Sequence, residues 1–291
     1  MTQQTTNRIL MVKPCSFYKN PQAVDNLFYG KPLAVEGFSS EWDNLRKTLQ
    51  SKGIDVFSYY DDNQARPDSI FPNNWFSTHP GGRMCLYPMA MENRRTEKEN
   101  ALSDLEKLYP DLYNLEGHIK DNRFLEGTGS MVLDRKNKVA YAAASQRTDL
   151  KLFYQWCVEL GYEPVYFHTN QNNPVYHTNV LMSIGENYSI VCSELLEDLQ
   201  ERERLISSLS AHRPLLDIPI EHAFNFCANV IELKSPSGDG LLVMSERSYN
   251  KYDHKQKGWL LDKVTEIVSC DLSTIENLGG GGARCMIAEL F

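Results

Sequence analysis

Cys285 is the residue of this chain best placed to act as a nucleophile. It follows a run of four glycines and Ala283-Arg284, where the backbone can bend tightly and let a ligand approach the start of a strand. A cysteine with a distant histidine and carboxylate is the general pattern of a thiol nucleophile, because neighbours in the fold need not be neighbours in the sequence. The alternative interpretation is a core thiol that caps the last strand.

Two further residues stand at the start of apolar runs and could complete such a site. His177 precedes the run 180–184, a position that suits either acid/base catalysis or a structural imidazole. Glu126 follows two apolar residues and precedes glycines, and taken alone it is better interpreted as a carboxylate that caps a turn. Other thiols lie within apolar patterns, where buried, inert side chains are expected: Cys85, Cys157, Cys192, Cys227 and Cys270.

No arrangement typical of a metal or nucleotide site accompanies these residues. The sequence contains neither CxxC nor HExxH, and His222 and Cys227 have no further Cys or His nearby. The glycine run 279–282 lacks the Lys-Ser/Thr pair and the following helix of a phosphate loop. We therefore expect no metal and no organic cofactor.

The composition restricts the class of partner. The chain has 291 residues, of which 42% are hydrophobic and 11% aromatic, so it can form a substantial core. Its net charge of −8 argues against nucleic acid or a membrane surface as the main partner. No apolar run approaches the ~20 residues of a membrane span, and seven scattered cysteines without a signal peptide are typical of reduced thiols in the cytoplasm. We expect a cytoplasmic enzyme with a small-molecule substrate; a homo-oligomer is left open.

Caps and hydrophobic periodicity predict alternating hairpins, helices and strands. Helices are expected over 39–53, 96–108, 149–160, 194–209 and 255–268. Strands are expected over 9–12, 55–59, 84–87, 131–134, 139–143, 164–167, 180–184, 189–192, 230–233, 241–244 and 284–289.

This order is repeated about five times, as hairpin, helix and strand. Periods of ~45 to 60 residues suit a propeller of five modules better than a doubly wound sheet. The sequence shows no linker. It therefore predicts an α/β fold, a pseudo-symmetric propeller of five ββαβ modules, with residues 1–291 forming a single catalytic domain.

Five short motifs in a fixed order resemble the guanidine-modifying superfamily, which includes arginine deiminases, dimethylarginine hydrolases, amidinotransferases and succinylarginine dihydrolases. The motifs are Asp68-Ser-Ile-Phe-Pro-Asn-Asn-Trp75, Glu126-Gly127, Gln146-Arg147-Thr148, His177-Thr-Asn179 and Gly282-Ala-Arg-Cys-Met286. The segments 11–26 and 282–286 look most like the citrulline utilization hydrolase branch. The resemblance covers residues 8–291 and implies the pentein-type propeller.

The resemblance also implies roles for individual residues. Cys285 matches the family nucleophile, His177 the general acid/base, and Glu126 the carboxylate that holds the substrate nitrogen and the histidine. Arg147 matches a residue that fixes the substrate α-carboxylate, and a second such arginine is Arg94 or Arg95. The full set of expected substrate-binding residues is Asp68, Asn74, Asn179, Arg147, Arg95 and Asn20.

Asn74 and Asn179 stand where the deiminases of this superfamily carry carboxylates. Burying a guanidinium without its anionic partners costs on the order of 3–5 kcal/mol. A ureide is neutral, and Asn supplies both the donors and the acceptors that it needs. We therefore expect hydrolysis of L-citrulline to ornithine, ammonia and carbon dioxide through a covalent thiocarbamoyl intermediate.

Other functions stay open at this point. Asp68 keeps its carboxylate, so an arginine deiminase or arginine dihydrolase is the alternative. An amidinotransferase and a non-catalytic binding protein of the same fold are less favoured, because a binding protein has no reason to keep Cys, His and Glu at three strand ends together.

Overall fold

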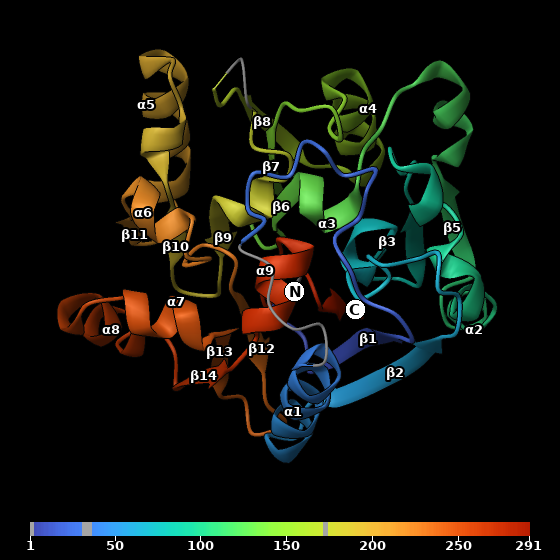
Figure 1. Cartoon of the computed structure of the whole chain (residues 1–291). Helices are drawn as coiled ribbons and strands as arrows, with labels where there is room; N and C mark the ends of the chain where they lie inside the picture. The colour runs from blue at the N-terminus through green and yellow to red at the C-terminus, as the bar shows by residue number, and fades with distance from the viewer. Residues whose placement is uncertain (1–2, 31–36, 171–173) are drawn as a thin grey trace.

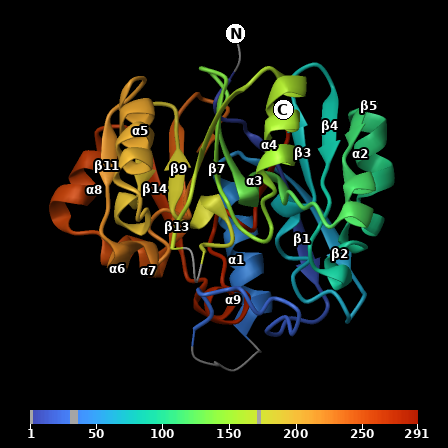
Figure 2. The ribbon, with the colours of Figure 1, turned by 90° about the horizontal axis from the view of Figure 1, so that it is seen from above.

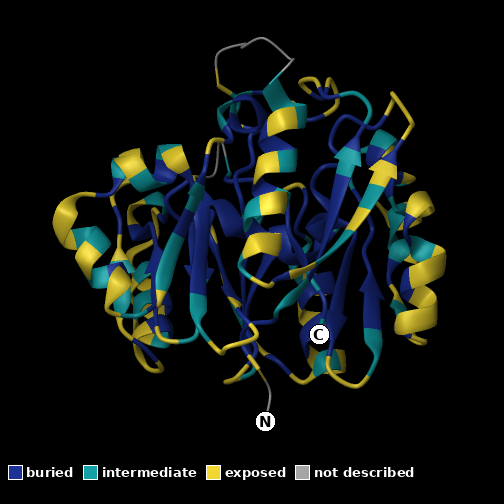
Figure 3. Ribbon diagram, turned by 90° about the horizontal axis from the view of Figure 1, so that it is seen from below, coloured by how far each residue is buried: buried dark blue, intermediate teal, exposed yellow. Residues whose placement is uncertain are grey.

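A computed structural model describes residues 3–30, 37–170 and 174–291. Within these ranges, five three-stranded sheets surround a common centre (Figure 1). Seen from above, helices α2 and α8 lie at opposite outer edges, with strands between them (Figure 2). Exposed residues concentrate on the outer helices, whereas the strands are largely buried (Figure 3). The sheets therefore enclose the centre and the helices shield them from solvent.

Each sheet has the same ββαβ order. Two strands pair antiparallel through a short turn, a helix crosses over, and the third strand pairs parallel with the second, since a parallel neighbour needs a long crossover. Four such units follow one another along the described chain.

The first unit consists of β3 (Phe76–His79), β4 (Arg83–Leu86), α2 (Leu102–Leu108) and β5 (Asp111–Asn114). The second consists of β6 (Met131–Asp134), β7 (Val139–Ala143), α4 (Leu150–Leu160) and β8 (Glu163–Phe167). The third consists of β9 (Met182–Ile184), β10 (Ser189–Val191), α5 (Leu199–Ser210) and β11 (Leu215–Asp217). The fourth consists of β12 (Ile231–Lys234), β13 (Gly240–Ser245), the two helices α7 (Glu246–Lys251) and α8 (His254–Leu261), and β14 (Glu266–Cys270).

The fifth sheet joins the two ends of the chain. Its strands and helix are β15 (Ala288–Glu289), β1 (Arg8–Pro14), α1 (Phe38–Ser51) and β2 (Asp55–Asp61). The C-terminal strand β15 pairs antiparallel with β1, so that Leu10 lies opposite Ala288, and β1 pairs parallel with β2. This pairing completes the ring and confirms the expected α/β fold of five ββαβ modules.

Local signals explain where several helices begin and end. The Asp149 side chain caps α4 by accepting a hydrogen bond from the Leu152 amide, and Gly161 ends it in the left-handed conformation at φ 69°. The helix α1 has no side-chain cap, but its buried residues fall on one face: Trp42, Leu45 and Leu49.

The prediction of a helix over 255–268 was wrong in its second half. The helix α8 ends at Leu261, and Glu266–Cys270 is the strand β14, where Val268 lies opposite Val243 of β13. The expected helices 96–108 and 194–209 begin later, at Leu102 and Leu199. Of the expected strand 284–289, only its last residues pair, as β15. Local pattern did not separate the last helix from the strand after it, because pairing with β13 decides this boundary.

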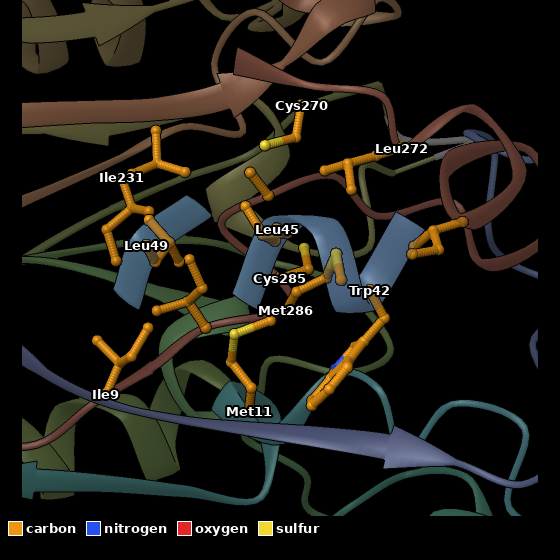
Figure 4. Close-up of a cluster of buried hydrophobic side chains, with 14 of the residues drawn as sticks. Ile9, Met11, Trp42, Leu45, Leu49, Ile231, Cys270, Leu272, Cys285 and Met286 are labelled. Carbon is orange, nitrogen blue, oxygen red and sulfur yellow. The ribbon is translucent and has the colours of Figure 1, made fainter. Parts of the chain in front are cut away.

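One hydrophobic cluster connects the fifth module to the centre. It packs side chains of α1 and β1 against residues that precede β15, including Cys285 and Met286 (Figure 4). Cys285 is 3% exposed, and its position is therefore fixed by the core on one side. None of the helices in the described part of the chain combines the length and apolar character needed to cross a bilayer.

Candidate active site

A small pocket at the centre brings most of the expected site residues together. Its empty volume is about 260 Å³. Its lining residues come from segments far apart in the sequence: Asn26, Asp68, Phe71, Asn74, Arg94, Arg147, Tyr176, His177, Gly279, Gly281 and Cys285. Asn74 lies in the helical turn 72–74, and His177 immediately precedes the turn 178–180. Glu126, beside the pocket, immediately precedes α3 (Gly127–Ser130).

His177 and Glu126 form a buried pair beside this pocket. The Nε2 atom of His177 lies 2.8 Å from Oε2 of Glu126, and the Ala90 amide donates to Oε1 of the same carboxylate at 2.9 Å. Burial opposes ionisation of Glu126, but the charge of Arg147 and the His177 hydrogen bond together lower its pKa to about 2. Burial lowers the pKa of His177, and Glu126 opposes this shift. The carboxylate therefore stays charged and orients the imidazole.

Cys285 lies between two asparagine side chains. The Asn229 Nδ2 atom donates to Sγ at 3.2 Å, and Sγ lies 3.7 Å from Oδ1 of Asn179. The Asn179 amide is itself fixed, because its Nδ2 atom donates to the Thr128 carbonyl at 3.0 Å. Burial raises the pKa of the Cys285 thiol, while the Asn229 hydrogen bond lowers it.

Asn74 is oriented by a buried arginine. The Arg94 Nη1 atom donates to Oδ1 of Asn74 at 2.9 Å, and two other nitrogens of Arg94 hold the Glu97 carboxylate at 2.8 and 3.0 Å. The same guanidinium lies 3.8 Å from Glu126. Arg94 thus links the pocket-lining amide of Asn74 to the Glu126 carboxylate.

Arg147 and Asp68 provide charges of opposite sign. Arg147 binds Asp25 of the N-terminal segment through two nitrogens, lies 3.6 Å from Glu126, and stacks 4.6 Å from the centre of the Tyr176 ring. Asp68 accepts a hydrogen bond from Asn20 at 2.7 Å through Oδ2. Its buried Oδ1 atom has no hydrogen-bond partner among the described residues. Burial raises the pKa of Asp68, against the effects of Arg94 and Asn20.

Three expected substrate-binding residues lie outside the pocket lining: Asn179, which contacts Cys285 from beside the pocket, Arg95 and Asn20. Arg95 is the clearer correction: its guanidinium donates to the carbonyls of Met89 and Ala90 at 3.1 Å, while its neighbour Arg94 lines the pocket. Consecutive residues point in different directions, and no sequence signal distinguishes these two arginines. Asn20 is buried behind Asp68 and acts on the pocket through that carboxylate.

Sequence reasoning missed Asn229 and Asp25, which hold the thiol and Arg147. Neither residue belongs to a recognised short motif. Their partners are 56 and 122 residues away along the chain, so only the fold brings them together. The expectation of inert thiols agrees with the structure at Cys157, Cys192 and Cys227, where burial raises the pKa of each to about 12. Over the described ranges, no group of three or more His, Cys, Asp or Glu side chains could hold a metal ion.

The comparisons with known proteins agree with this geometry. The family model for N,N dimethylarginine dimethylhydrolase, eukaryotic, matches residues 13–291. The crystal structure of apo ArgZ, an arginine dihydrolase from the ornithine-ammonia cycle in cyanobacteria, has a TM-score of 0.77 and 20% identity, and covers 97% of this chain. This chain spans only 40% of that structure, but 97% of the isolated N-terminal domain of ArgZ bound to product, which has a TM-score of 0.79 and 18% identity.

A second enzyme shares the fold over its whole length. A dimethylarginine dimethylaminohydrolase adduct with 4-chloro-2-hydroxymethylpyridine has a TM-score of 0.69 and 15% identity, with complete coverage of both chains. The search of curated proteins finds no match. At these identities the solved structures support the fold, and the family model supports the family. The chain belongs to the N,N dimethylarginine dimethylhydrolase family, a family of hydrolases that act on guanidino C–N bonds within the guanidine-modifying superfamily.

Proposed function

We propose that this chain is an arginine dihydrolase, which converts L-arginine and two water molecules into ornithine, two ammonia molecules and carbon dioxide. One observation carries the proposal: the carboxyl group of Asp68 and the amide of Asn74 line the same pocket as the Cys285 thiol. Glu126 and Asn179 lie outside this lining, where they contact His177 and Cys285. A guanidinium needs the carboxylates, and the neutral ureide that follows it needs the amides.

This proposal differs from the expectation of a citrulline hydrolase. That expectation depended on missing anionic partners at Asn74 and Asn179. Asp68 lines the pocket, and its Oδ1 atom has no hydrogen-bond partner among the described residues. The charged Glu126 lies beside the pocket, in contact with His177. These carboxyl groups reduce the free-energy cost of burying a guanidinium in the pocket. The expectation that a cationic substrate would be excluded depended on the absence of such groups, so it loses its main support. The family model and the arginine dihydrolase fold also favour a guanidino substrate.

In the proposed complex, the α-carboxylate and the guanidino group at the two ends of the substrate would each lie near protein groups of opposite charge. Arg147 lines the pocket, is oriented by Asp25 through two nitrogens, and matches the family residue that fixes the α-carboxylate, so it is the group proposed to bind that end of the substrate. The guanidino group would then lie at the Cys285 end of the pocket, between Asn74 and Asn179. The proposed substrate is thus a small amino acid.

We also propose that the chain folds as a pseudo-symmetric propeller of five modules and acts as one catalytic domain.

The proposed chemistry uses Cys285 as the nucleophile. Its thiolate attacks the guanidino carbon, a C–S bond forms, and ammonia leaves with a proton from His177. His177 then takes a proton from water, which attacks the same carbon and breaks the C–S bond to give the ureide. In a second attack by the Cys285 thiolate on the ureide carbon, a new C–S bond forms and ornithine leaves with a proton from His177, which gives a thiocarbamoyl enzyme. Water then breaks this C–S bond, and the carbamic acid that is released decomposes into ammonia and carbon dioxide. Glu126 keeps His177 in position for each proton transfer.

Hydrolysis of L-citrulline alone is the second candidate. The observation in its favour is that Asn74 and Asn179 both present neutral amides, and that Asn179 contacts Cys285 directly. Such an enzyme would accept the ureide and reject the cation.

A product assay tests these candidates. The purified protein is incubated separately with L-arginine, L-citrulline and dimethylarginine, and ornithine, citrulline and ammonia are quantified. Ornithine from both arginine and citrulline supports the dihydrolase. Citrulline that accumulates from arginine indicates a deiminase, and ornithine from citrulline alone indicates the second candidate. Citrulline released from dimethylarginine alone would overturn both.

A pair of cysteine variants shows whether the pocket carries the activity. Cys285→Ala is expected to lower turnover by more than a thousandfold, because it removes the covalent step. Cys15→Ser, at a half-buried thiol beyond the end of β1, should retain the wild-type rate. Turnover in Cys285→Ala within tenfold of wild type would contradict the assignment of the nucleophile.

A further inference from the structure

The Asn229 side chain is held so firmly that only its donor atom can face Cys285. Its Oδ1 atom accepts a hydrogen bond from the Gly282 amide at 2.9 Å. This contact fixes the orientation of the amide, so the Nδ2 atom must point the other way. Nδ2 donates to the Asn179 backbone carbonyl at 2.8 Å and to the Cys285 Sγ atom at 3.2 Å, and it lies at a longer 3.4 Å from Oδ1 of Asn179. Both N–H bonds therefore have a partner, and one of them is the sulfur.

The segment before Asn229 contains a strained residue that helps to place it. Phe226 has φ 60°, a left-handed conformation that is rare for a bulky side chain. The Asn229 amide nitrogen donates to the Phe226 carbonyl at 2.9 Å, and the Arg284 amide donates to the Asn229 carbonyl at 3.3 Å. The Asn229 backbone is thus tied both to the strained turn and to the residue next to Cys285.

The sulfur has one donor and one acceptor among its side-chain contacts. Asn229 donates to Sγ, whereas Oδ1 of Asn179 can only accept the thiol proton. A donor stabilises the thiolate, and an acceptor stabilises the thiol. Of the hydrogen bonds to this sulfur, the one from Asn229 lowers the pKa of Cys285 most. The titratable and charged groups that face this sulfur from the surrounding elements are Asp68, Arg94, Arg147, Tyr176, His177 and Arg284.

We propose that Asn229 is a catalytic residue that stabilises the Cys285 thiolate through its Nδ2–H bond and aims the sulfur at the substrate carbon. This role rests on the proposed function of Cys285 as the nucleophile. Asn229 is 1% exposed and does not line the pocket, so it acts on the sulfur from the side away from the substrate.

The test measures the ionisation of Cys285 without any substrate. The rate of alkylation by iodoacetamide is followed from pH 5 to pH 10 by mass spectrometry of the peptide that contains Cys285, with Cys285→Ser as the blank. In Asn229→Ala the pH of half-maximal rate should rise by about one unit, because a hydrogen bond to a charged group is lost. In Asn229→Asp the rise should be larger, since a carboxylate that keeps the Gly282 contact replaces the donor.

A matched asparagine on the same segment serves as the control. Asn225 is partly exposed and bonds the Glu221 carbonyl, so Asn225→Asp introduces the same chemical change without contact to the sulfur. Its alkylation midpoint should equal that of wild type. With the substrate that the wild type turns over, kcat of Asn229→Ala should fall at least tenfold while KM changes less than threefold.

Two results would overturn the role of Asn229. One is an unchanged alkylation midpoint in both variants together with a lower melting temperature, which would show that Asn229 only braces the Gly282 loop. The other is an unchanged kcat in Asn229→Ala. Alkylation does not require turnover, so the two proposals are tested separately. A raised alkylation midpoint in the Asn229 variants would support the role of Asn229 even if the wild type acted on neither arginine nor citrulline. That lack of turnover would refute only the proposed substrate.

Discussion

The Nε2 atom of His177 lies 2.8 Å from Oε2 of Glu126, with both side chains buried and the carboxylate also held by the Ala90 amide. This arrangement makes Nε2 the protonated ring nitrogen while Glu126 is charged, and it leaves Nδ1, which lies near Gly129, as the unprotonated ring nitrogen. The pair is the structural basis for the proton transfers that the proposed reaction requires.

Glu126→Gln is expected to lower kcat by roughly 10²–10⁴-fold, the range typical of lost general acid–base catalysis. The Gln oxygen would keep the Ala90 hydrogen bond, so its NH₂ group would face His177 and favour a proton on Nδ1 instead. Histidine ¹⁵N NMR would detect the change of tautomer, and product assays would measure kcat. An unchanged tautomer with activity within tenfold of wild type would contradict the role of the pair.

Arg147→Lys is expected to raise KM for L-arginine at least tenfold, because lysine cannot both hold Asp25 through two bonds and bind a carboxylate. Agmatine, which lacks the α-carboxylate, should be affected little. The matched control is Arg95→Lys, whose guanidinium contacts only backbone carbonyls and should not alter KM. Equal losses for arginine and agmatine would show that Arg147 does not bind the carboxylate.

Gly129→Ala is expected to lower activity at least tenfold. A Cβ atom there would lie 2.4 Å from Nδ2 of Asn74 and 2.8 Å from Nδ1 of His177, so both side chains would have to move. Gly117→Ala is the control, because no atom lies within 4 Å of its added Cβ. Kinetics and thermal melts of both variants provide the check; wild-type kcat in Gly129→Ala would mean that the pocket tolerates the shift.

Glu232→Gln is expected to stabilise the protein at alkaline pH. Burial raises the pKa of Glu232 from 4.5 to about 7, so the folded state binds a proton that the unfolded state has lost between these values. The stability of the wild type should therefore fall as pH rises from 4.5 through 7. At pH 8.5 the variant should be more stable by up to about 3 kcal/mol, and at pH 4.5 the difference should be small.

Urea unfolding at the two pH values measures this difference. Glu203→Gln, at an exposed position of α5, is the control and should change stability equally little at both. A Glu232→Gln variant that is no more stable than wild type at pH 8.5 would contradict the expected cost of the buried charge.

Features that depend on contacts within a few residues could be predicted from the sequence, whereas features that depend on contacts between distant residues could not. Asp149 and Gly161 mark the ends of α4 through contacts within a few residues, and such boundaries can be predicted from sequence. The boundary between α8 and β14 depends on the pairing of Val268 with Val243, which is 25 residues away along the chain. This boundary therefore could not be predicted from the sequence. The order of the five modules was predictable because each repeats the same local pattern.

The sequence by itself determined which chemical groups the site contains. Cys285 could be singled out because a thiol beside glycines is a local feature, whereas His177 and Glu126 were selected through the resemblance of the ordered motifs. The tertiary structure decided which groups surround them. It placed Arg94 rather than Arg95 in the pocket and brought Asn229 to the sulfur. Side-chain direction and contacts across many residues follow from packing, and packing is a property of the whole fold.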